Sequence, residues 1–119
     1  MLLSLPVFNQ KLLIRTLHSM GDLFFESKDF INAANLLYFA IRTGMFTRQF
    51  QLQCKVLQSL AKALGMMVYR QLALSCLNKA LEYALYYDDY GEELAIYHQL
   101  SKLYFDANDL KTAVYFHRK

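Results

Sequence analysis

The 119-residue chain contains little of what interrupts or crosslinks secondary structure. It has one proline, four glycines, two cysteines and no tryptophan. Glycine and proline make most tight turns, so these counts are too low for a β-sandwich or β-barrel with many turns. Apolar residues make up 55% of the chain, which is enough to bury a sizeable core. Because leucine, alanine, tyrosine and phenylalanine dominate, we expect an almost wholly helical protein.

The two cysteines do not form a recognisable metal or redox pair. Cys54 and Cys76 lie inside apolar helical patterns, without Cys-x-x-Cys or Cys/His spacing. We therefore expect two small buried hydrophobic side chains, with no metal and no cofactor.

Long apolar segments are also missing. No uninterrupted apolar run approaches the roughly 20 residues of a membrane span. Residues 1–8 are apolar, but they lack the basic region and the cleavage site of a secretory signal. We expect a cytoplasmic protein without a membrane span, either free or associated with the cytoskeleton.

Charge gives little indication of a nucleic-acid partner. The chain has 13 basic and 10 acidic residues, for a net charge of +3. Nucleic-acid interfaces cluster their basic residues on one face or stripe. Here the basic residues are scattered, so a solvated helical surface explains them better.

A 40-residue repeat runs through the chain. Small residues recur at Gly21, Ala61 and Ser101, each with a large residue three positions later. Alanines recur at positions 33, 73 and 113 in the same register. A fixed period of 20–50 residues is typical of repeat arrays. We expect these small residues to lie where two helices of a hairpin cross, because only small side chains allow axes to approach within about 8 Å.

The apolar spacing predicts six helices in three antiparallel hairpins, an all-α solenoid. The expected helices cover about 8–26, 30–42, 47–64, 69–85, 89–105 and 108–119. Asp29 is an expected N-cap and Asp89 with Glu92 an expected capping box, while Gly44 and Gly65 are expected helix ends. The repeats span about 14–53, 54–93 and 94–119, after a lead-in at 1–7, in one domain covering 1–119.

The repeated positions resemble the tetratricopeptide repeat, W-x2-L-G-x2-Y followed by A-x3-F and a later alanine. The matching positions are Leu17, Met20, Gly21, Phe24, Ala33, Leu37 and Ala40 in the first unit; Leu57, Leu60, Ala61, Leu64, Ala73, Leu77 and Ala80 in the second; and Tyr97, Leu100, Ser101, Tyr104 and Ala113 in the third, where His117 replaces an apolar residue. Tryptophan and the closing proline are absent. The 40-residue period is similar to that of lengthened arrays in LGN-type adaptors, rapsyn and ciliary proteins, and we interpret the chain as a piece of a longer array.

This resemblance implies a non-catalytic scaffold or adaptor with a concave groove lined by the first helix of each pair. The groove positions are Arg15, His18, Ser19, Asp22, Phe25, Lys55, Gln58, Ser59, Lys62, His98, Gln99, Lys102 and Phe105. Their balance is mildly basic. We therefore predict an extended or helical acidic peptide as the partner, with Phe25 and Phe105 as apolar anchors; an ordinary solvated surface is the alternative.

Other functions are less well supported by the residues. No phosphate-binding loop or metalloprotease motif is present, and Ser19 and Ser59 are expected to have no base and carboxylate around them, so we expect no enzyme. The alternatives to an adaptor are a structural subunit of a cytoskeletal or ciliary assembly and helical-repeat RNA binding. Tyr86, Tyr87 and Tyr90 form a second candidate contact site, or else pack against the next hairpin.

Overall fold

The computed structural model describes residues 7–106, and every element within this range is a helix. The helices are α1 (Val7–Glu26), α2 (Phe30–Thr47), α3 (Phe50–Met66), α4 (Arg70–Tyr86) and α5 (Tyr90–Asp106). Each helix packs against the next one along the chain. This confirms an all-α fold of consecutively packed helices. The sixth helix expected at 108–119, with Ala113 and His117, and positions 1–6 of the expected lead-in lie outside the described residues.

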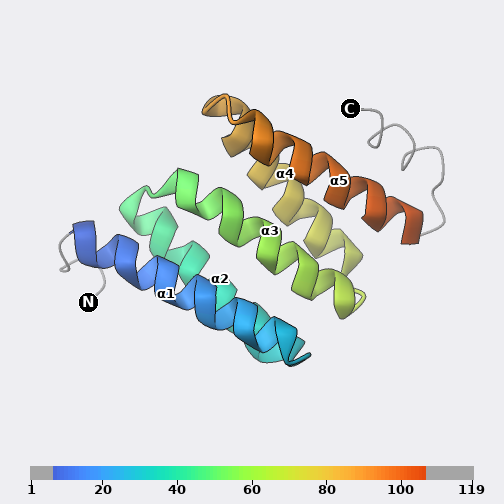
Figure 1. Cartoon of the computed structure of the whole chain (residues 1–119), viewed down its shortest axis with the longest axis horizontal. Coiled ribbons are helices and arrows are strands. Elements are labelled where there is room, and N and C mark those ends of the chain that lie inside the picture. Colours follow the sequence, from blue (N-terminus) through green and yellow to red (C-terminus); the bar gives the residue numbers. More distant parts are fainter. Residues whose placement is uncertain (1–6, 107–119) are drawn as a thin grey trace.

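The helices form two layers. α1, α3 and α5 lie side by side in the front layer of Figure 1, with α2 and α4 behind them. α3 contacts both α1 and α5 as well as its sequence neighbours. The first helix of each hairpin therefore contributes to one shared layer.

The turns between helices repeat every 20 residues, half the period seen in the sequence. Lys28, Arg48, Val68 and Asp88 all have left-handed backbones, with φ between 54° and 66°. In each turn the next residue donates its N–H to a carbonyl five positions earlier, at 2.9–3.0 Å. This bond is the outer one of a Schellman-type C-cap. One turn geometry therefore connects all five described helices.

The expected helix ends at Gly44 and Gly65 are wrong. α2 continues through Gly44 to Thr47, and α3 continues through Gly65 to Met66. None of the described glycines has a positive φ. Gly44 is required for space instead, because a Cβ there would lie 2.7 Å from Cγ of Gln53. In each turn, the residue with the left-handed backbone is not glycine but a residue with a side chain.

The small residues at the helix crossings are confirmed for the first two hairpins. Ala33 and Ala73 are fully buried, and Ala61 is nearly so. A Cβ on Gly21 would lie 2.7 Å from Cγ of Leu37, so the backbone of α1 approaches α2 closely. Met20, by contrast, was expected among the apolar pattern positions and is 42% exposed.

Candidate functional site

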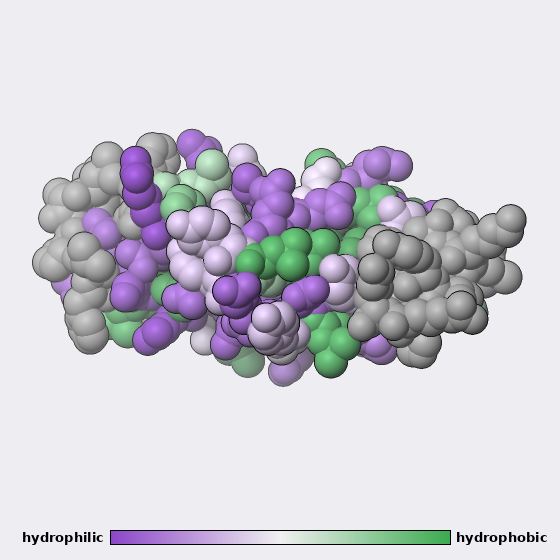
Figure 2. Space-filling model, turned by 90° about the horizontal axis from the view of Figure 1, so that it is seen from above, coloured by the Kyte–Doolittle hydropathy of each residue, from purple (hydrophilic) through white to green (hydrophobic). Residues whose placement is uncertain are grey.

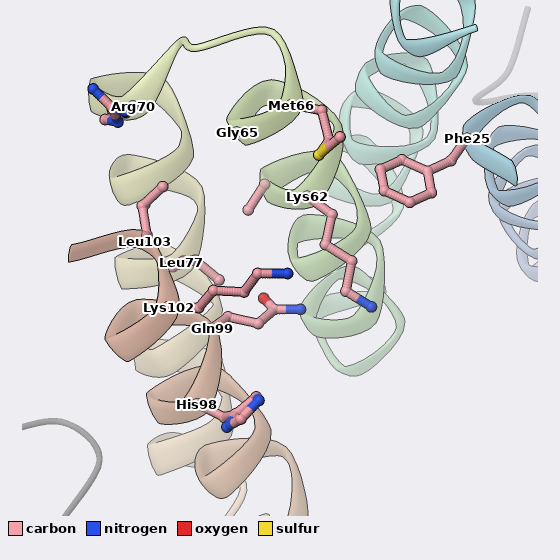
Figure 3. Close-up of a pocket in the computed structure, with 11 residues that line it drawn as sticks. Phe25, Lys62, Gly65, Met66, Arg70, Leu77, His98, Gln99, Lys102 and Leu103 are labelled. Carbon is pink, nitrogen blue, oxygen red and sulfur yellow. The ribbon is translucent and has the colours of Figure 1, made fainter. Parts of the chain in front are cut away.

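The face formed by α1, α3 and α5 contains a hollow of about 450 Å³, which we call the α3–α5 hollow. Most of its wall comes from the C-terminal halves of α3 and α5, with the start of α4 closing one end (Figure 3). The lining residues are Phe25, Ala61, Lys62, Gly65, Met66, Arg70, Leu77, His98, Gln99, Lys102 and Leu103.

Five of the expected groove residues meet in this hollow: Phe25, Lys62, His98, Gln99 and Lys102. Lys62 lies on α3, and the last three lie on α5. Figure 3 shows the side chains of Gln99 and Lys102 reaching from α5 toward α3. The repeat register therefore places residues 36–40 positions apart at one site.

The charge of the hollow is of one sign. Lys62, Arg70 and Lys102 line it, and none of its lining residues is acidic. Arg70 was not expected here, because it begins α4, a second helix of a pair. The sequence could have indicated this position, because Arg70 directly follows the α3–α4 turn and that turn lies beside the C-terminal end of α3.

An unsatisfied acceptor lies within this basic wall. Oε1 of Gln99 is buried and has no hydrogen-bond partner. Buried polar atoms in folded proteins are nearly always paired, and an unpaired one calls for an explanation. This oxygen exposes less than 1 Å² of surface, so a ligand N–H group reaches it only if the Gln99 side chain moves.

A second hollow continues along α5. It measures about 630 Å³ and is lined by Gln58, Lys62, Gly91, Leu94, Ala95, Tyr97, His98 and Gln99. Lys62, His98 and Gln99 line both hollows. We refer to the two together as the α3–α5 groove. It also has no acidic lining residue along this second part.

Gln58 was expected to be a solvated contact residue, but it is mostly buried and connects α3 to α5. It is 8% exposed. Its Nε2 donates to Oε2 of Glu92 on α5 and, at 3.3 Å, to the carbonyl of Cys54. The bond to Glu92 helps hold the start of α5 against α3. It therefore helps set the width of the groove.

The expected capping box is only half formed. Oδ1 of Asp89 accepts from the N–H of Glu92 at 3.2 Å, as expected. The Glu92 carboxylate binds Gln58 instead of returning to Asp89, whose own N–H bonds to the carbonyl of Ala84. The N-cap at Asp29 is confirmed, since Oδ1 accepts from the N–H of Asn32 at 3.4 Å.

Both cysteines have inert thiols. Cys54 is buried as expected, and Cys76 is partly buried. Burial, and then the nearby Glu92 carboxylate, raise the pKa of the Cys54 thiol to about 11. Burial alone raises the pKa of Cys76 to about 11. Only thiolates are good nucleophiles, so neither residue is reactive at neutral pH.

A histidine and a carboxylate lie near Ser59, which the sequence did not indicate. Nε2 of His18 lies 2.9 Å from Oγ of Ser59 and 3.4 Å from Oδ2 of Asp22. Both contacts are made by the same ring nitrogen. A catalytic triad needs the carboxylate on Nδ1, opposite the nitrogen that bonds the serine. This cluster therefore connects α1 to α3, but its geometry is not that of a catalytic triad.

The remaining expected residues are not brought to the groove. Arg15 lines a separate hollow between α1 and the start of α3. Ser19, Lys55 and Phe105 are exposed and line none of these three hollows. The anchor role expected of Phe105 therefore has no support from these hollows. Phe25 lines the α3–α5 hollow and also packs against Phe30, with ring centroids 5.3 Å apart.

The tyrosines at the α4–α5 turn are exposed. Tyr86 is 80% and Tyr90 75% exposed, while Tyr87 is 38% exposed and contacts Tyr86 edge to face. The sequence left two interpretations open, an exposed contact site or packing against the next hairpin. Among the described residues these tyrosines are exposed.

We found no protein-family model, curated protein or solved structure that matches the chain. Within residues 7–106 no helix is both long and apolar enough to cross a bilayer. The same part of the chain contains no group of three or more His, Cys, Asp or Glu side chains placed to hold a metal ion.

Proposed function

We propose that the protein is a non-catalytic adaptor of the tetratricopeptide type, an α-solenoid that binds an acidic peptide in the α3–α5 groove. The 20-residue helix-and-turn unit and the shared face of α1, α3 and α5 support the solenoid. In such an array each hairpin covers a face of the next. Phe105, which is 61% exposed, offers a face of this kind near the end of α5. Figure 2 shows the molecule from above, with apolar side chains (green) near the middle of this face between hydrophilic ones (purple).

The observation that carries the binding proposal is the single sign of charge in the groove. Lys62, Arg70 and Lys102 line the α3–α5 hollow with no acidic side chain among its lining residues. Complementary potentials steer partners and determine which partner binds. An acidic segment would complement this wall, whereas a basic segment would meet repulsion along its whole length.

The rest of the wall suits a peptide with apolar side chains between its acids. Met66, Leu77 and Leu103 are apolar lining residues of the same hollow. The volume of about 450 Å³ falls within the range of ligand sites. Oε1 of Gln99 would accept from a peptide N–H once its side chain turns into the hollow.

The test is binding of fluorescein-labelled synthetic peptides that mix glutamate with leucine or phenylalanine, followed by anisotropy. We expect Lys62→Glu/Lys102→Glu to weaken binding by more than tenfold, because each reversal turns an attraction into a repulsion. Lys55→Glu, on the same helix but outside the groove, is the matched control. Wild-type affinity should fall with added salt. Equal binding by wild type and double variant would overturn the proposal.

A structural subunit is the second candidate, and the exposed tyrosines favour it. Tyr86 and Tyr90 form an aromatic surface at the α4–α5 turn, away from the α3–α5 hollow. Exposed aromatic side chains are common anchors of interfaces. A subunit held there would keep its assembly after Lys62→Glu/Lys102→Glu and lose it after Tyr86→Ala/Tyr90→Ala, as measured by co-purification. An adaptor would show the opposite pattern.

A further inference from the structure

A smaller hollow lies at the opposite end of α3 from the α3–α5 hollow. It measures about 190 Å³ and is enclosed by α1, the α2–α3 turn and the end of α4. We call it the α1–α3 hollow. Its lining residues are Lys11, Arg15, Arg48, Gln49, Phe50, Gln51, Leu52 and Tyr87.

Every charged residue that lines the α1–α3 hollow is basic. They are Lys11, Arg15 and Arg48. Neither of the two ion pairs found among the described residues involves them. Lys11 and Arg15 are one helical turn apart on α1, a spacing at which like charges repel. Three cations therefore share one small hollow, and an anion placed there would be attracted by all of them.

The start of α3 adds to the positive potential of this hollow. Gln49 is the N-cap of α3. The first turn of α3 contains no acidic residue. The N-terminal end of a helix carries a partial positive charge from its backbone N–H groups. Here that charge reinforces three side-chain cations, and no described lining residue offsets it.

We propose that the α1–α3 hollow binds a phosphate group. Two guanidinium groups match the oxygens of a phosphate, since each can donate two parallel hydrogen bonds, and the Lys11 ammonium adds a further donor. The double negative charge of a phosphate neutralises most of the triple positive charge. The rings of Phe50 and Tyr87 form apolar walls beside the cations. This site is separate from the acidic-peptide groove and does not depend on it.

The test is titration of the intact protein with inorganic phosphate, followed by NMR of the backbone amides at constant ionic strength. Amide shifts at the start of α3 should saturate with phosphate but not with chloride. Arg15→Gln and Arg48→Gln should each weaken phosphate binding by about tenfold or more, because each removes a charge-assisted pair. Lys28→Gln, an exposed cation on the α1–α2 turn, should bind as wild type.

Circular dichroism of each variant checks that the fold is retained, which these exposed positions should allow. A second arm compares a phosphoserine peptide with its unphosphorylated form. Tighter binding of the phosphoserine peptide than of inorganic phosphate identifies a phosphorylated side chain as the source, and equal binding identifies free phosphate. Equal shifts with chloride and phosphate, or unchanged phosphate binding by both arginine variants, would overturn the proposal.

Discussion

Replacing Gly44 with alanine should destabilise the protein, although alanine is the better helix former. The substitution alone favours a helix by about 1 kcal/mol. The new Cβ, however, would lie 2.7 Å from both Cγ and Nε2 of Gln53. Gln53 is 1% exposed, and its Nε2 donates to the carbonyl of Ile41 at 3.1 Å. Moving Gln53 would break that bond and strain the α2–α3 contact.

The two costs exceed the gain. A buried polar group that loses its partner costs about 1–3 kcal/mol, and overpacking costs about 1–3 kcal/mol more. After subtraction of the helix-propensity gain, we expect Gly44→Ala to lower the free energy of unfolding by about 1–5 kcal/mol. The measurement is urea unfolding followed by circular dichroism. Wild type and variant are compared with the same dependence of the unfolding free energy on urea concentration.

Gly65→Ala is the matched control. Gly65 also lies inside a helix, but a Cβ there meets its nearest neighbour, Cδ1 of Leu103, at 3.8 Å, an ordinary contact distance. Only the helix-propensity gain remains, so this variant should be more stable by up to about 1 kcal/mol. If Gly44→Ala proved as stable as Gly65→Ala, the close packing of α2 on α3 through Gln53 would be refuted.

Three further predictions follow from single contacts. Val68→Gly should raise the free energy of unfolding by about 1 kcal/mol, because a β-branched residue is strained at φ 66° and the Val68 side chain is 66% exposed; a lower urea midpoint would contradict this. The pKa of Cys54, raised to about 11 from 9.0, implies that stability falls as pH rises through this range, since the unfolded thiol ionises first. As the pH rises above 9, the urea midpoint of Cys54→Ala should therefore decline less steeply than that of wild type. Equal declines in the two proteins would contradict this prediction. Glu92→Ala should cost about 1–2 kcal/mol and speed hydrogen exchange in α5 more than in α1, while Glu93→Ala should not.

The helical fold was predictable because it depends on periodicity and small residues. The positions of Ala33, Ala61 and Ala73 in a 40-residue register indicated where helices cross, and all three are buried. The helix ends were not predictable from glycine. The C-caps use Arg48 and Val68 in the left-handed conformation, while Gly44 serves packing between helices. Sequence alone does not distinguish a glycine needed for space from one needed for its backbone.

The site was predictable where it depends on repeat register and not where it depends on side-chain partners. Lys62, His98 and Lys102 meet because equivalent positions on α3 and α5 face the same groove. Gln58 was mistaken for a solvated residue because its partner, Glu92, is 34 positions away in sequence. Arg70 was missed because only the first helix of each pair was expected to line the groove.

Chemical-shift mapping with an acidic peptide tests the central claim most directly. The claim is that the basic α3–α5 groove is the binding surface. The largest shifts on adding a glutamate-rich, leucine-containing peptide should fall on Lys62, Gln99 and Lys102, and they should diminish as salt is added. Shifts confined to the tyrosines of the α4–α5 turn, or to the layer of α2 and α4, would contradict it.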